Sequence, residues 1–335
     1  MNTSLIDAIA KAVLYEGYML YPYRASSVKN RQRFNFGVLY PKLYSEAQTG
    51  SDAWTMQTEC LVEGASSAIE TPAIEIRVRF LKLVSRTSRD IAEASPPWQE
   101  AIECEVIVPP QNLDALVAAP LHWDFVFAAK EESEDLRDEN GEIAGRIDRS
   151  QKSLQGSVLV NATHVEPDLF KLQVQVQSLT PLERNPDQTS RDSALMQSLV
   201  SAHALLGVVN AQFVSLLEPP ESLKNLAASC ENIGAWPVLV GAVGQRDTML
   251  ASPIILYDYP QIAPESPGDL FDGTEIDEIL ALRIMTMTED EKREMRMTDD
   301  RARKILERTE ALPVEHFAKL HGTLRELHSL KEDTP

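Results

Sequence analysis

Alternation of apolar and polar residues is the feature that most limits how this 335-residue chain can fold. From Ile74 to Phe80, apolar side chains alternate with charged ones, and from Leu172 to Gln177 they alternate with glutamines. A period of two places each set of residues on its own face of a β-strand. The sequence therefore predicts strands that bury one face.

Similar runs recur between about residues 50 and 180, and their spacing predicts an antiparallel sheet or sandwich. Pro109–Pro110 is expected to end the strand before it, because proline cannot donate a hydrogen bond to a sheet ladder. The acidic run Glu131–Glu142 predicts a solvated loop or hairpin tip between two strands. The remaining runs are 54–62, 102–108, 121–128, 154–165 and 169–179.

Helical spacing appears near the N-terminus and again after Pro181. Asn2 or Thr3 can cap a first helix whose apolar residues extend to Leu14. The apolar spacing over Ser193–Val209 also predicts a helix. Thr274 and Thr288 resemble N-caps, with acidic residues in the first turn that follows. Further helices are expected at 221–229, 274–285, 288–296, 299–311 and 313–330, and strands at 238–243 and 249–256.

These patterns together predict an α+β fold, an antiparallel β-rich body with a helical C-terminal region. Residues 1–265 are expected to form the mixed body, which includes the N-terminal helix and a Tyr/Arg-rich loop. Residues 266–335 are expected to form a helical region packed on that body. Because no linker-like stretch divides them, we expect one intimate unit.

Charge and cysteine content exclude several classes of protein. A formal net charge of -19 would repel a nucleic-acid backbone and an anionic membrane surface. No apolar run approaches the roughly 20 residues of a membrane helix, and the N-terminus lacks the pattern of a secretory signal. Three widely spaced cysteines, Cys60, Cys104 and Cys230, indicate reduced, buried thiols. We therefore expect a cytoplasmic protein that binds no nucleic acid and inserts in no membrane.

No motif in the chain predicts a catalytic or metal site. His316, His321 and His328 are spaced by five and seven residues, which does not place all three on one helix face. His122, His164 and His203 could meet only through folding. Capping explains the acidic residues of 269–278, and a turn between strands explains the glycines of 241–244. We expect no metal and no cofactor.

One segment near the N-terminus has a different composition. Six of the eight tyrosines lie between Tyr15 and Tyr44, together with a basic island in an acidic chain. Tyrosine and arginine are enriched in the hot spots of protein interfaces. The alternative is that the tyrosines pack on the sheet while the arginines pair with acids of the same chain. The candidate protein-binding residues are Tyr18, Tyr21, Tyr23, Arg24, Lys29, Arg31 and Arg33.

Three stretches carry a resemblance to a known family. The strings Tyr15–Arg33, Tyr40–Pro41 and Ala251–Leu280 resemble an uncharacterised bacterial family whose genes accompany those of high-affinity, oxygen-tolerant nickel–iron hydrogenases. The similarity extends over most of the chain and rests on family-specific strings, not on a functional motif. No catalytic residues are assigned in that family, so none can be transferred to this chain.

The resemblance implies a hydrogenase-associated function. By association, it implies a non-enzymatic accessory, maturation or assembly protein, chaperone-like in character, that acts on a hydrogenase subunit through protein binding. A protein that itself carried nickel or an iron–sulfur cluster should show a His-rich tract or clustered cysteines, and the sequence has neither. The alternatives are an enzyme whose site forms only on folding and a structural subunit of the hydrogenase complex.

Overall fold

The computed structural model of the chain describes residues 3–15, 36–50, 52–64, 71–89, 98–137, 141–261, 284–298 and 300–311. These residues belong to two compact units. The first unit, called the body below, contains the described residues up to Gln261, and the second contains those after residue 283. The body is rich in strands, and its strand pairs are antiparallel, as the alternating runs predicted.

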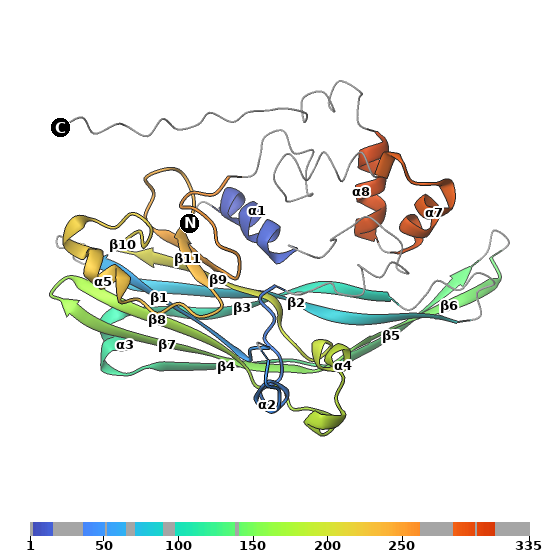
Figure 1. Cartoon of the computed structure of the whole chain (residues 1–335), viewed down its shortest axis with the longest axis horizontal. Coiled ribbons are helices and arrows are strands. Elements are labelled where there is room, and N and C mark those ends of the chain that lie inside the picture. The colour runs from blue at the N-terminus through green and yellow to red at the C-terminus, as the bar shows by residue number, and fades with distance from the viewer. Residues whose placement is uncertain are drawn as a thin grey trace. The chain divides into compact units, whose positions relative to one another are not determined.

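Two sheets form the body, and Figure 1 shows them as two layers. The first sheet has the order β10–β1–β8–β7–β4, and the second has the order β11–β12–β9–β2–β6–β5, with β3 on the free edge of β2. The strands of the first sheet are β10 Ala211–Phe213, β1 Thr55–Gly64, β8 Leu169–Ser178, β7 Leu154–Glu166 and β4 Leu121–Phe127. Those of the second are β11 Trp236–Leu239, β12 Thr248–Ser252, β9 Val200–Val209, β2 Ala73–Arg89, β6 Ile143–Gln151, β5 Lys130–Arg137 and β3 Trp98–Asn112.

The space between the sheets is an apolar core built from alternate residues of each strand. Ile76, Val78 and Phe80 of β2 belong to it, whereas Gln173 and Gln175 of β8 point away from it and are only partly buried. Each buried aliphatic or aromatic side chain contributes about 1.5–3 kcal/mol relative to its exposed state. The predicted alternation is therefore confirmed in both of the runs that showed it best.

One two-stranded ribbon passes from the first sheet to the second. β4 and β7 form its first half, β5 and β6 its second, and the ribbon bends between Phe127 and Lys130. Lys82 of β2 is buried at this bend, where its Nζ donates a 2.6 Å hydrogen bond to the carbonyl oxygen of Ala128. Strands that change sheet make the corners of a sandwich, and Lys82 fixes this corner.

The opposite side of the body is closed by two connections between the sheets. β9 of the second sheet continues into β10 of the first through Asn210, whose φ is +55°. Asparagine tolerates this left-handed conformation better than most residues. Gln57 of β1 also exchanges backbone hydrogen bonds of 2.8 and 2.9 Å with Ile233, shortly before β11 begins.

Helix α1, Thr3–Leu14, covers the outer face of the second sheet. Its apolar face contacts Leu205 of β9 and residues of β11 and β12. The hydroxyl of Ser201 donates a 2.9 Å hydrogen bond to the carbonyl oxygen of Val13 in the last turn. The predicted N-terminal helix is confirmed. Its buried residues include Ile6, Ile9, Ala10, Val13 and Leu14.

β9 shows that the helix expected over Ser193–Val209 is wrong. Only the start of this stretch is helical, in α4, Arg191–Leu195, which Ser190 caps. β9 faces the core on one side and α1 on the other, so nearly all of its residues are buried. A strand buried on both faces loses the period of two, and its apolar run then resembles a helical one.

β3 corrects the strand end expected at Pro109–Pro110. The strand continues to Asn112, and its register against β2 shifts where the prolines lie, because Ile76 opposes Val108 whereas Ile74 opposes Gln111. Proline is tolerated on edge strands and at bulges, and β3 offers both. The two residues therefore mark an irregularity within the strand.

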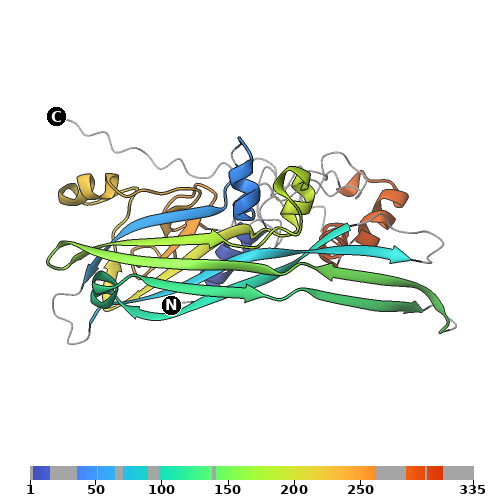
Figure 2. The same ribbon diagram turned by 90° about the horizontal axis from the view of Figure 1, so that it is seen from below.

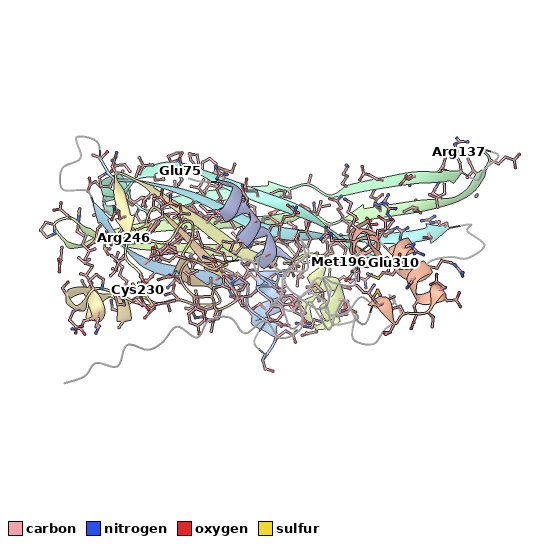
Figure 3. The ribbon with its side chains drawn as sticks, turned by 90° about the horizontal axis from the view of Figure 1, so that it is seen from above. Glu75, Arg137, Met196, Cys230, Arg246 and Glu310 are labelled. Atoms are coloured by element: carbon pink, nitrogen blue, oxygen red, sulfur yellow. The ribbon has the colours of Figure 1, made fainter. Side chains whose placement is uncertain are left out.

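β5 corrects part of the loop expected over Glu131–Glu142. Lys130–Arg137 is a strand, although its residues have low β propensity and are almost all exposed. Arginines of β6 pair across to it, with Arg146 Nε 2.9 Å from Asp135 and Arg149 Nη1 2.9 Å from Glu134. Such opposite-charge pairs stabilise neighbouring strands. Arg137, at the end of this hairpin, is labelled in Figure 3.

Short helices complete the body. They are α2 Lys42–Ala47, α3 Leu113–Ala118 and α5 Lys224–Ala228, the last lying within the helix predicted over 221–229. Asn112 caps α3, because its side chain accepts a 3.1 Å hydrogen bond from the backbone N–H of Ala115. The two strands predicted around 238–256 are β11 and β12, and the turn predicted between them contains Gly241 and Gly244, both with positive φ.

The described residues of the second unit include the helices α7 Glu289–Thr298 and α8 Asp300–Glu310. Thr288 and Glu291 form the capping box at the start of α7, which confirms Thr288 as an N-cap. Lys292 and Arg296 of α7 both pair with Glu310 of α8, at 3.0 and 2.9 Å. Thr274, most of the helix predicted over 274–285 and all of that predicted over 313–330 lie outside the described residues.

Candidate partner-binding surface

One side of the body, called the open side below, ends in two strands with free edges. It consists of β3, α3 and β4, and among the described residues β3 pairs with β2 alone and β4 with β7 alone. In Figure 2 the edge strand β4 runs beside its neighbour β7. An edge strand presents unpaired backbone N–H and C=O groups, which are ready to pair with another chain.

Large apolar side chains are exposed along the open side. Ile107 of β3 is 56% exposed and Val126 of β4 is 66% exposed, both on the outward faces of their strands. Ile102 and Trp123 occupy inward positions, yet they are 39% and 36% exposed. Because β3 and β4 belong to different sheets, Ile107 and Val126 lie on opposite outer faces of the body. Exposed apolar residues on unpaired strands are typical of protein-binding surfaces.

Carboxylates lie between these apolar residues on β3. Glu103 accepts a 2.7 Å hydrogen bond from the hydroxyl of Tyr15, and Glu105 lies 2.7 Å from Nε of Arg79. The same guanidinium contacts Asp7 of α1 at 2.7 Å. Burial alone would lower the pKa of Arg79, but its bonds to the two carboxylates outweigh this and raise the pKa. Lys11 of α1 lies 3.9 Å from Glu103, so three carboxylates face two cations here, and the outward face of β3 keeps a net negative charge and is firmly held.

The other outer strands of the sheets lack this combination. Along β10 and β11 the chain covers its own edges, because Phe213 donates to the carbonyl oxygen of Arg246 at 2.7 Å and Leu239 donates to Asp258 at 2.8 Å. The edge of β5 is exposed, but seven of its eight residues are polar or charged. Arg246, whose carbonyl oxygen accepts this bond from Phe213, is labelled in Figure 3. Only the open side joins free edges to exposed apolar residues within the described part of the chain.

His203 of β9 is the most strongly perturbed histidine in the body. Its side chain is fully buried beneath α1, and Nδ1 donates a 2.9 Å hydrogen bond to the carbonyl oxygen of Ser201. Nε2 has no hydrogen-bond partner among the described residues. Burial lowers the pKa of His203 to about 4, and the charge of Arg79 acts in the same direction. The imidazole is therefore neutral at pH 7 and lies in packed structure away from the open side.

The three histidines of the body, which could have met only through folding, do not form a common site. His122 lies on β4 and pairs with Asp124 at 3.1 Å, whereas His164 lies on β7 and pairs with Asp114 of α3 at 3.2 Å. His203 has its own backbone acceptor. His316, His321 and His328 lie outside the described residues.

The three cysteines are free thiols, as predicted. Cys60 and Cys104 are buried in the core, and Cys230 is partly buried beside α5. Burial raises the pKa of Cys104 to about 11, although the neighbouring Lys82 opposes this. Burial also raises the pKa of Cys230 to about 11. Both thiols are therefore protonated at pH 7 and are poor nucleophiles.

A pocket of about 660 Å³ lies at one end of the first sheet, where Glu63, Glu166 and Asp168 line it. Arg246 pairs with Glu63 at 3.2 Å, so part of this negative charge is already balanced. In the described ranges no three His, Cys, Asp or Glu side chains are grouped so that they could hold a metal ion.

The residues predicted to bind a partner cannot be placed. Tyr18, Tyr21, Tyr23, Arg24, Lys29, Arg31 and Arg33 all lie outside the described residues. Three tyrosines of the same cluster are placed: Tyr15, which is partly buried and bonds to Glu103, and Tyr40 and Tyr44, which are buried. Tyr40 packs against Tyr44 with ring centroids 5.4 Å apart, and Arg191 lies over the Tyr40 ring. For this pair, the alternative of packing within the chain is confirmed.

Sequence reasoning missed the open side, although two signals pointed to it. Pro109–Pro110 lies inside β3, and proline within a strand indicates an edge or a bulge. Ile107 and Val126 also occupy outward positions, where the alternation of Glu103 and Glu105 in one run and of His122 and Asp124 in the other leads one to expect a polar residue.

Comparisons with protein-family models, with curated proteins and with solved structures found no match to this chain. Among the described residues, no helix has both the length and the apolar character needed to span a membrane.

Proposed function

We propose that this protein is a non-enzymatic accessory, maturation or assembly protein that binds a nickel–iron hydrogenase subunit through its open side. The observation that carries the protein-binding part is the presence of exposed Ile107, Trp123 and Val126 on two strands with free edges. Burying such residues against a partner would remove apolar surface from water and satisfy open backbone groups at once.

The body favours binding over chemistry at this surface. The open side offers a free edge and a firmly held acidic face, in which Glu105 and Arg79 are paired at 2.7 Å. A rigid surface binds a partner with little loss of conformational freedom, which favours affinity. The buried groups with perturbed pKa values, His203 and Cys104, are enclosed by packing.

The hydrogenase part of the proposal rests on the resemblance of Tyr15–Arg33, Tyr40–Pro41 and Ala251–Leu280 to the hydrogenase-associated family. The proposal places the protein in the cytoplasm, where such subunits mature. It also includes a helical C-terminal region over 266–335 packed on the body. Tyr18, Arg31 and the other five residues of the predicted docking segment remain candidates for a second contact.

Co-purification from native cells tests the proposal. The variant Ile107→Glu/Val126→Glu places charges on the open side at positions that are already exposed, so it should fold normally. Truncating or reversing an interface hot spot typically weakens binding by about thirtyfold or more. We expect the wild type to retain a hydrogenase subunit, identified by mass spectrometry, and the variant to lose it. The yield of active hydrogenase should fall with it.

Val243→Glu supplies the matched control, because Val243 is 77% exposed on the turn between β11 and β12. This variant should keep the partner. Equal retention by both variants would refute the role of the open side, and the absence of any hydrogenase subunit from the wild-type material would refute the proposed function. A subunit that stays bound in the active, mature enzyme would instead identify a structural subunit of the complex.

A further inference from the structure

We infer that the free edge of β3 accepts an extended segment of the partner protein as an added β-strand, with apolar and basic residues in alternation. This inference rests on the proposed function, and it specifies how the open side would be occupied. In strand addition, backbone hydrogen bonds supply affinity and the alternating side chains supply specificity.

The backbone of β3 is suited to strand addition. The strand has 15 residues, and in the described part of the chain only β2 pairs with it. Natural proteins usually shorten, cover or bend a free edge of this length. This chain covers the edges of β10 and β11 with its own loops, whereas no described segment pairs with the free edge of β3, and Ile107 is exposed.

The side chains of β3 dictate the pattern of the added strand. On the inward face, Cys104, Val106 and Val108 belong to the core, and Ile102 extends that face into solvent. Apolar residues of an added strand would lie beside this set and cover Ile102. On the outward face lie Glu103, Glu105 and Ile107, all exposed. Lysine or arginine at the alternate positions would lie beside the two glutamates and pair with them.

A second copy of this chain fits the edge poorly. If β3 paired with its own symmetry mate in antiparallel fashion about Cys104, Glu103 of one copy would oppose Glu105 of the other. Like charges in directly opposed positions destabilise a strand pair. The net charge of -19 adds a general repulsion between copies. The edge therefore selects a basic partner over itself.

The edge of β5 provides an internal comparison. It is as open as β3 and carries Glu131, Glu132, Glu134 and Asp135, but its single apolar residue is Leu136. An added strand there would gain charge attraction and backbone bonds with little burial of apolar surface, which is a marginal arrangement in water. A ligand attracted by charge alone would bind β5 at least as well as β3.

A labelled peptide tests the inference on the full-length protein. The probe is an eight-residue peptide of alternating valine and lysine, and its control carries N-methyl groups on alternate backbone nitrogens. We expect the probe to bind and the control to bind at least tenfold more weakly, because N-methylation removes backbone donors and keeps the charge. Hydrogen–deuterium exchange should show new protection in Trp98–Asn112 and none in Lys130–Arg137.

Matched charge reversals supply the second arm. Glu103→Lys on β3 should weaken probe binding by about fivefold or more, since an attraction becomes a repulsion. Glu131→Lys, on the exposed edge of β5, should leave it unchanged. Normal thermal unfolding of both variants would show that the fold is intact.

Three outcomes would overturn the inference: no binding of the probe, equal binding of the N-methylated control, or equal protection of β5. None of these outcomes decides the proposed function, because that function is tested by whether the wild type retains a hydrogenase subunit during co-purification. A wild type that retains this subunit but fails the peptide test binds its partner in another way. A wild type that passes the peptide test but retains no subunit has an open edge with a different partner.

Discussion

His203 should make the stability of the body sensitive to acid. The change to test is His203→Gln, because a glutamine amide can still donate to the carbonyl oxygen of Ser201 but does not titrate in this range. His203 is fully buried between β9 and α1, and Arg79, which pairs with Asp7 and Glu105, lies opposite it on β2. Protonation of His203 would therefore place a second cation beside Arg79 without a carboxylate of its own.

The magnitude follows from the difference between the two pKa values. In the unfolded chain the imidazole has its ordinary pKa of about 6.5, and in the fold burial lowers it to about 4. As pH falls below the unfolded value, the unfolded state gains a proton that the folded state resists, so stability is lost down to the folded pKa. A difference of about 2.5 units corresponds to about 3 kcal/mol once both states are protonated. Between about pH 7.5 and 5.5 the expected loss is about 1 kcal/mol.

Urea unfolding of wild type and His203→Gln at several pH values measures this loss. The range from about pH 7.5 to 5.5 stays above the isoelectric point of about 4.8, so solubility is preserved. Every other titrating group is common to both proteins, and the change in their difference reports His203 alone. His122→Gln, which replaces an exposed imidazole, is the control for the substitution itself and should leave the fold intact. A stability difference between wild type and His203→Gln that stays constant across this range would refute the reasoning.

Substitutions at Lys82 and Gly156 test the interior. Lys82→Met keeps the packed stem but removes the donor to the carbonyl oxygen of Ala128, so we expect it to lower the free energy of unfolding in urea by about 1–2 kcal/mol. Lys82→Ala also leaves a cavity and should cost more. Equal losses in the two variants would show that the hydrogen bond is irrelevant. Gly156→Ala would bring a Cβ against the Phe125 ring and within 2.6 Å of the Gln177 carbonyl oxygen, so it should lower the free energy of unfolding by about 1–3 kcal/mol. Gly50 has open space around it, and Gly50→Ala should change that free energy by less than about 0.5 kcal/mol.

The sequence predicted strands well where one face is buried and the other is exposed to solvent. β2 and β8 alternate because Ile76 and Val174 face the core while Arg77 and Gln175 do not, and this pattern is local. The prediction for β9 was wrong for the opposite reason, because α1 covers the second face of this strand. That cover comes from residues almost 200 positions earlier in the chain, and no local pattern could indicate it.

The open side could not be predicted because an edge is a property of the whole sheet. Ile107 and Val106 are adjacent residues of similar character, yet the first is 56% exposed and the second is buried. Which strand lies outermost depends on the order in which the strands pair. Here the two-stranded ribbon sets that order, because its β4 and β7 half lies in the first sheet and its β5 and β6 half in the second. Glu131–Glu142 gave no sign of this crossing, since its strand is stabilised by arginines of β6 and not by its own propensity.

The strong acidity of the chain and its open apolar edge fit together physically. An exposed edge that carries Ile107 would be a risk for aggregation in a chain of low net charge. Here Glu103 and Glu105 lie on that edge, and the net charge of -19 keeps copies apart. If β3 accepts a strand as inferred above, the same repulsion would act on every acidic competitor and favour a basic partner, so carboxylates that oppose self-association would also narrow the choice of partner. Specificity is the difference between the affinity for the correct partner and the affinity for a competitor. The negative charge of the chain would lower the affinity for acidic competitors.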